Sequence, residues 1–242
     1  MSWKTCLAAG VLCLAAAPVA ASAESAAKGG PRIDPDVMVE GFLVAHPDLR
    51  WRGEGLRAYG KQEYPRALEY LKRAALYADK PSQAIVAAMY WDGVGVEQDR
   101  PLAYAWMDIA AERLYHDFVL SREAYWNALG EAERAEALRR GQAILAEYGD
   151  DVAKPRLEKT LRRQARQATG SRLGFVGNLV IVPNTGPLAD TEITLRGDQY
   201  YAPEYWEPEA YWRLQDRIWK APVRERVDVG DVEQVEAPAR PD

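Results

Sequence analysis

The feature that most constrains the fold is a helical pattern that occurs twice. The segment from Ala67 to Ala75 has Ala, Tyr, Leu, Ala and Ala at positions 67, 70, 71, 74 and 75. The same spacing returns 36 residues later as Ala103, Trp106, Met107, Ala110 and Ala111. Apolar residues three or four positions apart share one face of an α-helix. One helical pair cannot bury its own apolar face, so the repeat predicts an all-α solenoid of stacked pairs.

The small residues of the pattern predict close packing between antiparallel helices. We expect the large aromatic residues to fill the space between successive pairs; these are Tyr70, Tyr90 and Trp106. The turn before the second copy, from Tyr90 to Asp99, contains Gly93 and Gly95. We expect both glycines to adopt positive φ, and Asp99 to cap the helix that follows. Val94 and Val96 occupy positions where a calcium loop needs oxygen ligands, so the sequence argues against calcium binding.

The second copy resembles a Sel1-like repeat, a relative of the tetratricopeptide repeat with a longer, glycine-containing loop. The resemblance rests on Tyr90, Gly93, Gly95, Asp99, Ala103, Trp106, Ala110 and Ala111. It spans roughly residues 48–115, and the first unit, whose turn is shorter, looks more like a plain tetratricopeptide unit. Pro101, Leu102 and Met107 depart from the family pattern.

This resemblance implies an α-solenoid that works as an adaptor or scaffold and has no catalytic residue. It also implies that the first helix of each pair lies on the concave side. The candidate partner contacts on these helices are Arg57, Lys61, Gln83 and Trp91.

Composition divides the rest of the chain. Lys4, an uncharged run rich in Ala and Leu, and Ala21-Ser22-Ala23 predict a secretory signal peptide; a retained anchor is the alternative, which the shortness of the apolar run disfavours. The expected regions are 1–23 signal peptide, 24–34 linker, 35–170 solenoid, 171–220 extension rich in β-branched and aromatic residues, and 221–242 disordered acidic tail. Within the solenoid, residues 117–148 are predicted to form a degenerate third pair.

The signal predicts an exported protein of the periplasm, or a secreted one. Both cysteines, Cys6 and Cys13, lie inside the signal, so we expect no disulfide and no transmembrane segment after cleavage. The formal net charge of −5 becomes more negative once Lys4 is removed. An acidic chain of this kind argues against a general nucleic-acid partner.

Charge is distributed unevenly along the chain. Residues 154–172 are strongly basic, with Glu158 as their one acidic residue, whereas residues 190–242 are mainly acidic. The basic segment is either a solvated helix face or a surface that receives an acidic partner. That partner is either the protein's own tail or an external anionic surface such as phospholipid headgroups. The tail is favoured because it is tethered nearby.

Residues 171–220 combine two patterns. Leu173 to Val182 and Thr191 to Leu195 predict a β-hairpin, which must lean on the solenoid because two strands alone are marginal. The aromatic residues that follow are Tyr200, Tyr201, Tyr205, Trp206, Tyr211, Trp212 and Trp219. We expect them to dock on the solenoid, because their exposure would invite aggregation. The alternative is that Trp206, Tyr211 and Trp212 bind another protein or stack on sugar rings of a cell-wall glycan.

Catalytic, metal and cofactor motifs are missing from the sequence. His46 and His116 have no accompanying ligand or nucleophile pattern and are interpreted as capping or surface residues. The sequence therefore favours a non-enzymatic adaptor or scaffold of the bacterial cell envelope with a protein partner. The alternative function is a carbohydrate-binding or hydrolytic envelope protein that uses Glu204, Glu207 or Glu209 beside the aromatic segment.

Overall fold

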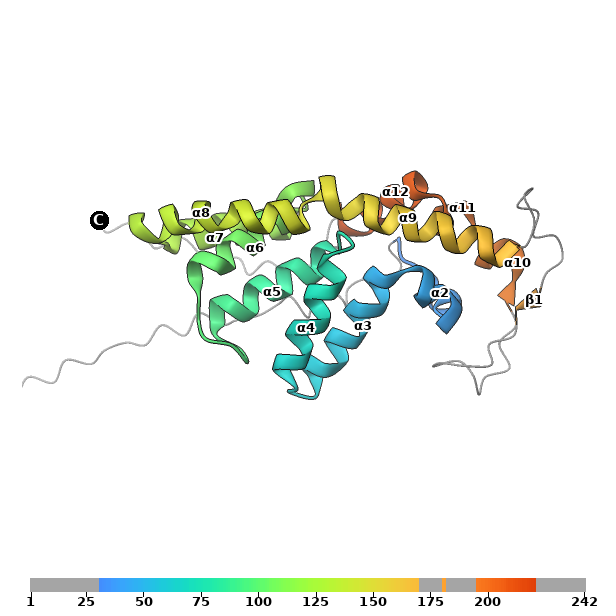
Figure 1. Ribbon diagram of the computed structural model, residues 1–242, viewed down its shortest axis with the longest axis horizontal. Helices are drawn as coiled ribbons and strands as arrows, with labels where there is room; N and C mark the ends of the chain where they lie inside the picture. Colours follow the sequence, from blue (N-terminus) through green and yellow to red (C-terminus); the bar gives the residue numbers. More distant parts are fainter. Residues whose placement is uncertain (1–30, 170–179, 182–194, 221–242) are drawn as a thin grey trace, which may run out of the picture.

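The computed structural model describes residues 31–169, 180–181 and 195–220. Its described part is a layered arrangement of α-helices with one short β-ladder (Figure 1), so the all-α prediction is confirmed. The elements up to the last repeat helix are η2 (Pro35–Val37), α2 (Glu40–Ala45), α3 (Pro47–Gly60), α4 (Tyr64–Ala75), α5 (Lys80–Asp92), α6 (Arg100–Ala110) and η3 (Ala111–Arg113). The elements that follow are α7 (His116–Ala128), α8 (Glu131–Tyr148), α9 (Asp150–Thr169), β1 (Val180–Ile181), β2 (Leu195–Arg196), α10 (Gly197–Tyr200), α11 (Pro203–Trp206) and α12 (Pro208–Lys220).

The two copies of the sequence pattern form two helical pairs, α3 with α4 and α5 with α6, and α4 packs on α5. The small residues of the pattern are fully buried: Ala67, Ala74, Ala75, Ala103, Ala110 and Ala111. Helices in the first pair approach so closely that a Cβ on Gly55 would lie 2.7 Å from Cγ of Leu71. Close packing at small residues thus builds each pair, as the spacing predicts.

The glycine turn between α5 and α6 fixes how the second pair meets the first. Gly93 has φ of 70° and ends α5, and its N–H donates to the carbonyl oxygen of Met89. Gly95 has φ of 71°, and a Cβ there would lie 2.1 Å from Cβ of Tyr64 at the start of α4. Asp99 accepts a hydrogen bond from the Leu102 N–H at 3.1 Å and caps α6. The turn therefore needs glycine at Gly95 both for its backbone conformation and for its contact with the first pair.

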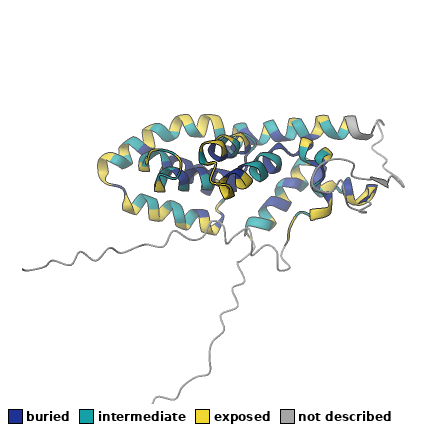
Figure 2. Ribbon diagram, turned by 90° about the horizontal axis from the view of Figure 1, so that it is seen from below, coloured by how far each residue is buried: buried dark blue, intermediate teal, exposed yellow. Residues whose placement is uncertain are grey.

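Helices α7 and α8, predicted to form a degenerate third pair, each pack on α6 rather than on each other, so they enclose α6 and do not continue the stack. After Gly149, α9 follows α8, and the two lie nearly end to end along one edge of the molecule (Figure 1). Buried residues gather where this edge meets the repeat pairs (Figure 2). Trp106 of α6 is 2% exposed and lies with its ring centroid 4.5 Å from that of Tyr148.

The equivalent residue of the first pair lies at the surface. Tyr70 stacks on Trp51 with ring centroids 5.5 Å apart and is only half-buried. It does not fill the space between pairs, because α4 packs mainly on α3 and α5 while α6 is also covered by α8.

The aromatic extension is helical. The β-ladder pairs Val180 with Arg196 and Ile181 with Leu195, and the rest of the predicted hairpin lies outside the described residues. The aromatic residues belong to α10, α11 and α12. These helices close the N-terminal end of the molecule through a second hydrophobic core, which contains Val37, Phe42, Leu49, Leu195, Tyr200, Tyr205, Trp206 and Leu214.

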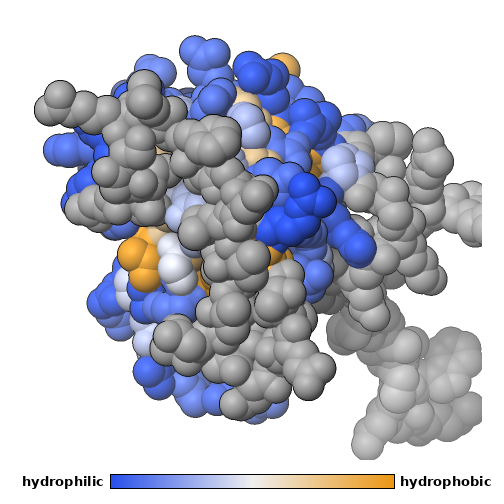
Figure 3. Space-filling view, turned by 90° about the vertical axis from the view of Figure 1, so that its right-hand side faces the viewer, coloured by the Kyte–Doolittle hydropathy of each residue, from blue (hydrophilic) through white to orange (hydrophobic). Residues whose placement is uncertain are grey.

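Where described residues are visible at that end, the surface is mostly hydrophilic, with hydrophobic residues showing only in small patches (Figure 3). Among the helices that the structure describes, none is long and apolar enough to cross a membrane. The predicted signal peptide, residues 1–23, and the predicted acidic tail, residues 221–242, lie outside the described residues.

Candidate functional site

Two of the aromatic residues proposed as partner contacts are part of the core. Tyr211 is fully buried, and its hydroxyl donates to Oδ2 of Asp48 at 2.5 Å. Trp206 is 7% exposed, and its Nε1 donates to the carbonyl oxygen of Tyr200 at 2.7 Å. The structure therefore corrects the interpretation of Trp206 and Tyr211 as surface anchors: they dock the extension on α2, α3 and α9.

Trp212 is only half-buried but is held by the same interface. Its Nε1 donates to Oε1 of Glu158 at 3.1 Å. The Arg113 guanidinium lies 4.7 Å from its ring centroid, and the Lys154 ammonium lies 5.4 Å from it. A ring that already contacts two cations has little free face for a sugar.

Two further residues are more buried than the sequence predicts. Gln83 is fully buried, and its Nε2 donates to the carbonyl oxygen of Tyr148 at 3.0 Å, so it joins α5 to α8 and cannot contact a partner. His46, interpreted as a capping or surface residue, does cap the end of α2 but is fully buried. Its ring stacks on Phe42, and its two nitrogens lie 2.8 Å from the carbonyl oxygens of Phe42 and Tyr205. Burial lowers the pKa of His46 to about 4.

A buried ionic network runs through the same interface. The Lys80 ammonium lies 2.7 Å from Glu112 and 2.9 Å from Asp150, and it donates to the carbonyl oxygen of Ile109 at 2.8 Å. Burial, together with the nearby Asp79, raises the pKa of Asp48 to about 7. Perturbed groups of this kind often mark an active site. Here Lys80 and Asp48 are at most 2% exposed, so no substrate reaches them and the network joins helices instead.

Trp91 remains at the surface and is part of an ordered stack. Its ring lies parallel to that of Tyr125 on α7, with centroids 3.9 Å apart and an interplanar angle of 5°. The Arg100 guanidinium lies 5.1 Å from the Trp91 ring centroid, and the Gln98 side chain donates to the Trp91 carbonyl oxygen at 2.7 Å. Burial and the nearby Asp92 carboxylate raise the pKa of Tyr125, so its hydroxyl stays neutral.

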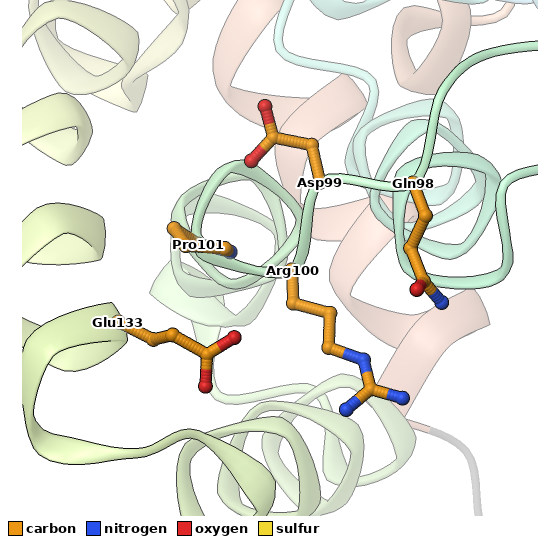
Figure 4. Close-up of a pocket in the computed structure, with 5 residues that line it drawn as sticks. All are labelled: Gln98, Asp99, Arg100, Pro101 and Glu133. Atoms are coloured by element: carbon orange, nitrogen blue, oxygen red, sulfur yellow. The ribbon is translucent and has the colours of Figure 1, made fainter.

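A hollow of about 400 Å³ adjoins this stack, between the start of α6 and the turn from α7 to α8. It is lined by Gln98, Asp99, Arg100, Pro101 and Glu133. Arg100 and Glu133 reach into it from opposite sides (Figure 4).

The charges around the hollow differ in how they are held. Both oxygens of Asp99 accept hydrogen bonds from Arg140 at 2.8 Å. Glu133 accepts one from the Gly130 N–H at 2.9 Å. Within the described residues neither Arg100 nor Glu133 has an oppositely charged group within 4.0 Å, although Arg100 lies near enough to Asp92 to act against the burial that raises the pKa of its carboxyl. We call Trp91, Gln98, Arg100, Tyr125 and Glu133 the Trp91 surface.

The sequence profile of the Sel1 repeat matches residues 49–76 and 80–113. The chain carries two Sel1 repeats. The first repeat coincides with α3 and α4, so this unit, expected to be a plain tetratricopeptide pair, is of Sel1 type as well. No curated protein and no solved structure matches the chain. Sel1 repeats are in general protein–protein interaction modules and are typically non-catalytic.

The Trp91 surface thus lies where the second Sel1 repeat meets α7 and α8. Of the residues expected to bind a partner, it contains Trp91. Arg57 and Lys61 are exposed at the other repeat, where Arg57 pairs with Glu54 at 2.5 Å, and no described contact joins them to Trp91. The sequence did not point to Arg100, Tyr125 or Glu133. The signal available for Tyr125 was its position in the predicted third pair.

Proposed function

We propose that this protein is an adaptor or scaffold of the bacterial cell envelope that binds a protein partner at the Trp91 surface. The observation that carries the proposal is the half-buried stack of Trp91 on Tyr125 with the exposed Arg100 beside it. Trp, Tyr and Arg are the residues that most often dominate the free energy of protein–protein binding. The stack is held by three helices, so a partner meets rings that are already in place, which lowers the entropic cost of binding.

The hollow beside the stack favours a particular kind of contact. Its volume of about 400 Å³ suits one or two side chains of a partner rather than a whole helix. Arg100 and Glu133 offer one positive and one negative charge on opposite sides. A partner segment that carries both a carboxylate and a cation complements them, and a segment with one sign of charge leaves the other group uncompensated.

The cell-envelope location is part of the proposal and rests on the predicted signal peptide at residues 1–23.

The glycan alternative has less support. Trp206 and Tyr211 are buried, Trp212 is flanked by cations, and Glu204 pairs with Arg217 at 3.0 Å. The side chains that would have formed a sugar platform are therefore engaged within the fold.

Site-specific photo-cross-linking in cells tests the proposal. A photoreactive residue replaces Gln98, at the rim of the hollow, and a second variant carries it in place of Arg66. Arg66 is exposed and lies beside a comparable half-buried stack, Trp51 on Tyr70, and so provides a matched control. We expect one protein to be captured at position 98, not at position 66, and to be lost when Trp91→Ala is added. Capture of the same proteins at both positions would contradict the proposal.

A further inference from the structure

One face of α9 carries a row of exposed cations that have few partners among the described residues. Lys159, Arg162, Arg163 and Arg166 are all exposed and recur at helical spacing. The opposite face of the helix is buried, with Leu157 and Leu161 packed against Tyr211. We call the four cations the α9 cationic face.

These cations have few partners within the described residues. Arg162 pairs with Glu158 at 3.0 Å, and Arg166 donates to the Arg162 carbonyl oxygen. Glu158 also accepts from Trp212, so its charge is shared. Lys159 and Arg163 make no ion pair with any described residue. A concentrated positive patch on a chain with formal net charge −5 attracts an anion.

Residues 225–236 carry the complementary charge. Their acidic residues are Glu225, Asp228, Asp231, Glu233 and Glu236, and Arg226 is their one basic residue. This acidic segment follows α12, which runs along α9. Trp212 of α12 contacts Lys154 and Glu158, and Asp216 accepts from the Tyr115 hydroxyl at 2.8 Å.

The distances allow contact within one chain. The α9 cationic face begins nine residues after Asp150, about 14 Å along the helix at 1.5 Å per residue. Asp216 and Lys220, near the end of α12, contact Tyr115. Arg113, two residues before Tyr115, pairs with Asp150, so the end of α12 lies towards the start of α9. Asp228 is the eighth residue after Lys220, and an extended chain of eight residues spans up to about 28 Å.

We propose that the acidic segment 225–236 binds the α9 cationic face of the same chain. Its tether gives it an effective concentration in the millimolar range, which exceeds that of a dilute external anion. The pairs are at the surface, so salt screens them, with a Debye length of about 10 Å at 0.1 M ionic strength and about 3 Å at 1 M. The bound segment shields the α9 cationic face from other anions and leaves the Trp91 surface open.

Zero-length carbodiimide cross-linking of the full chain tests this contact. Lys159 is the one lysine of the α9 cationic face, and the reagent joins its amine to a carboxylate only when the two touch. Lys61 is also exposed and lies at the end of α3, so it serves as the matched control. Mixing ¹⁴N- and ¹⁵N-labelled chains separates intramolecular from intermolecular products.

We expect mass spectrometry to find Lys159 joined to residues 225–236 within one chain, at least about tenfold more often than Lys61 is at low salt. The reason is that the cations of the α9 cationic face hold the acidic segment beside Lys159. The excess should vanish at 1 M salt and in Arg162→Glu/Arg163→Glu, which keeps Lys159 and replaces exposed side chains only. Circular dichroism checks that this variant stays folded.

Equal cross-linking of Lys159 and Lys61, or an excess that salt leaves unchanged, would overturn the proposal. A second outcome would also overturn it. If Lys159 forms no cross-link, and the full chain sediments with phosphatidylglycerol vesicles while Arg162→Glu/Arg163→Glu does not, the α9 cationic face binds a lipid surface instead. None of these results depends on the Trp91 surface.

Discussion

The glycine turn between the Sel1 repeats provides the sharpest test of how they stack. Gly93 and Gly95 have nearly the same φ, 70° and 71°, but different surroundings. A Cβ on Gly93 meets nothing closer than 3.4 Å, whereas a Cβ on Gly95 would lie 2.1 Å from Cβ and 3.2 Å from Cα of Tyr64. These Tyr64 atoms cannot rotate away, so the backbone of the turn or of α4 must shift.

The two alanine variants should therefore differ. Gly93→Ala incurs only the cost of a left-handed backbone, about 1–2 kcal/mol. Gly95→Ala incurs the same cost plus overpacking of about 1–3 kcal/mol against the first repeat. At about 2–4 °C per kcal/mol for a chain of this size, Gly95→Ala should melt several degrees below Gly93→Ala.

Urea unfolding followed by circular dichroism measures both variants, and Gly60→Ala is the control because a Cβ there meets nothing within 4 Å. We expect the order of stability Gly60→Ala, Gly93→Ala, Gly95→Ala. If Gly93→Ala and Gly95→Ala lose the same free energy of unfolding, contact between the turn and Tyr64 does not set the stacking of the repeats.

Three further predictions concern the buried network and the tryptophans. The pKa of Asp48 is raised from 3.8 to about 7 in the folded protein. The folded state therefore holds this proton more tightly, and the free energy of unfolding falls as the pH rises from about 4 to about 7. Urea unfolding should show that the free energy of unfolding of the wild type, relative to that of Asp48→Asn, rises by about 2–3 kcal/mol from pH 8 to pH 5. The contribution of His46 is the same in both proteins and cancels. A difference in stability that does not change with pH would contradict the prediction. Lys80→Met should lower the free energy of unfolding by about 1–3 kcal/mol, because it removes the hydrogen-bonded cation shared by the exposed Glu112 and the half-buried Asp150. A loss below about 1 kcal/mol in the same assay would show that Arg113 and Lys154 suffice for Asp150. Trp106→Ala removes a core side chain and should lower the free energy of unfolding by about 3–5 kcal/mol, whereas Trp91→Ala should lower it much less. Equal melting temperatures of the two variants would contradict this assignment of core and surface.

The repeat pairs could be predicted because their signal is local. Ala74, Ala75, Ala110 and Ala111 occupy positions where only small residues allow close helices, and spacing alone reveals this. The difference in burial between Tyr70 and Trp106 could not be predicted, because the two residues occupy equivalent positions of the repeat. Whether each is buried depends on α8, which covers only the second repeat.

The helices of the extension were missed for a different reason. Pro203 and Pro208 look like helix breakers in a run of aromatics, but each stands at the first position of a helix, where proline is well tolerated. The spacing of Tyr211, Leu214 and Ile218 is a helical signal that the dense aromatic composition obscured.

The candidate site shows the same limit of local patterns. Trp91 could be proposed from its place on the first helix of a repeat, and Gln83 was proposed on the same grounds. The residues that distinguish them come from distant segments: Tyr148 covers Gln83, whereas Tyr125 and Arg100 hold Trp91 at the surface. Such neighbours follow from the packing of α7 and α8, which the repeat pattern does not specify.

The affinity of the protein captured at position 98 for three purified chains tests the central claim most directly. The chains are the wild type, Trp91→Ala and Trp51→Ala. The two variants remove comparable half-buried rings from the two sites. We expect Trp91→Ala to weaken binding by about 30-fold or more, as for a dominant contact residue, and Trp51→Ala to leave it within about threefold. Equal affinities of the wild type and Trp91→Ala, or a larger loss in Trp51→Ala, would contradict the proposal that the Trp91 surface binds the partner.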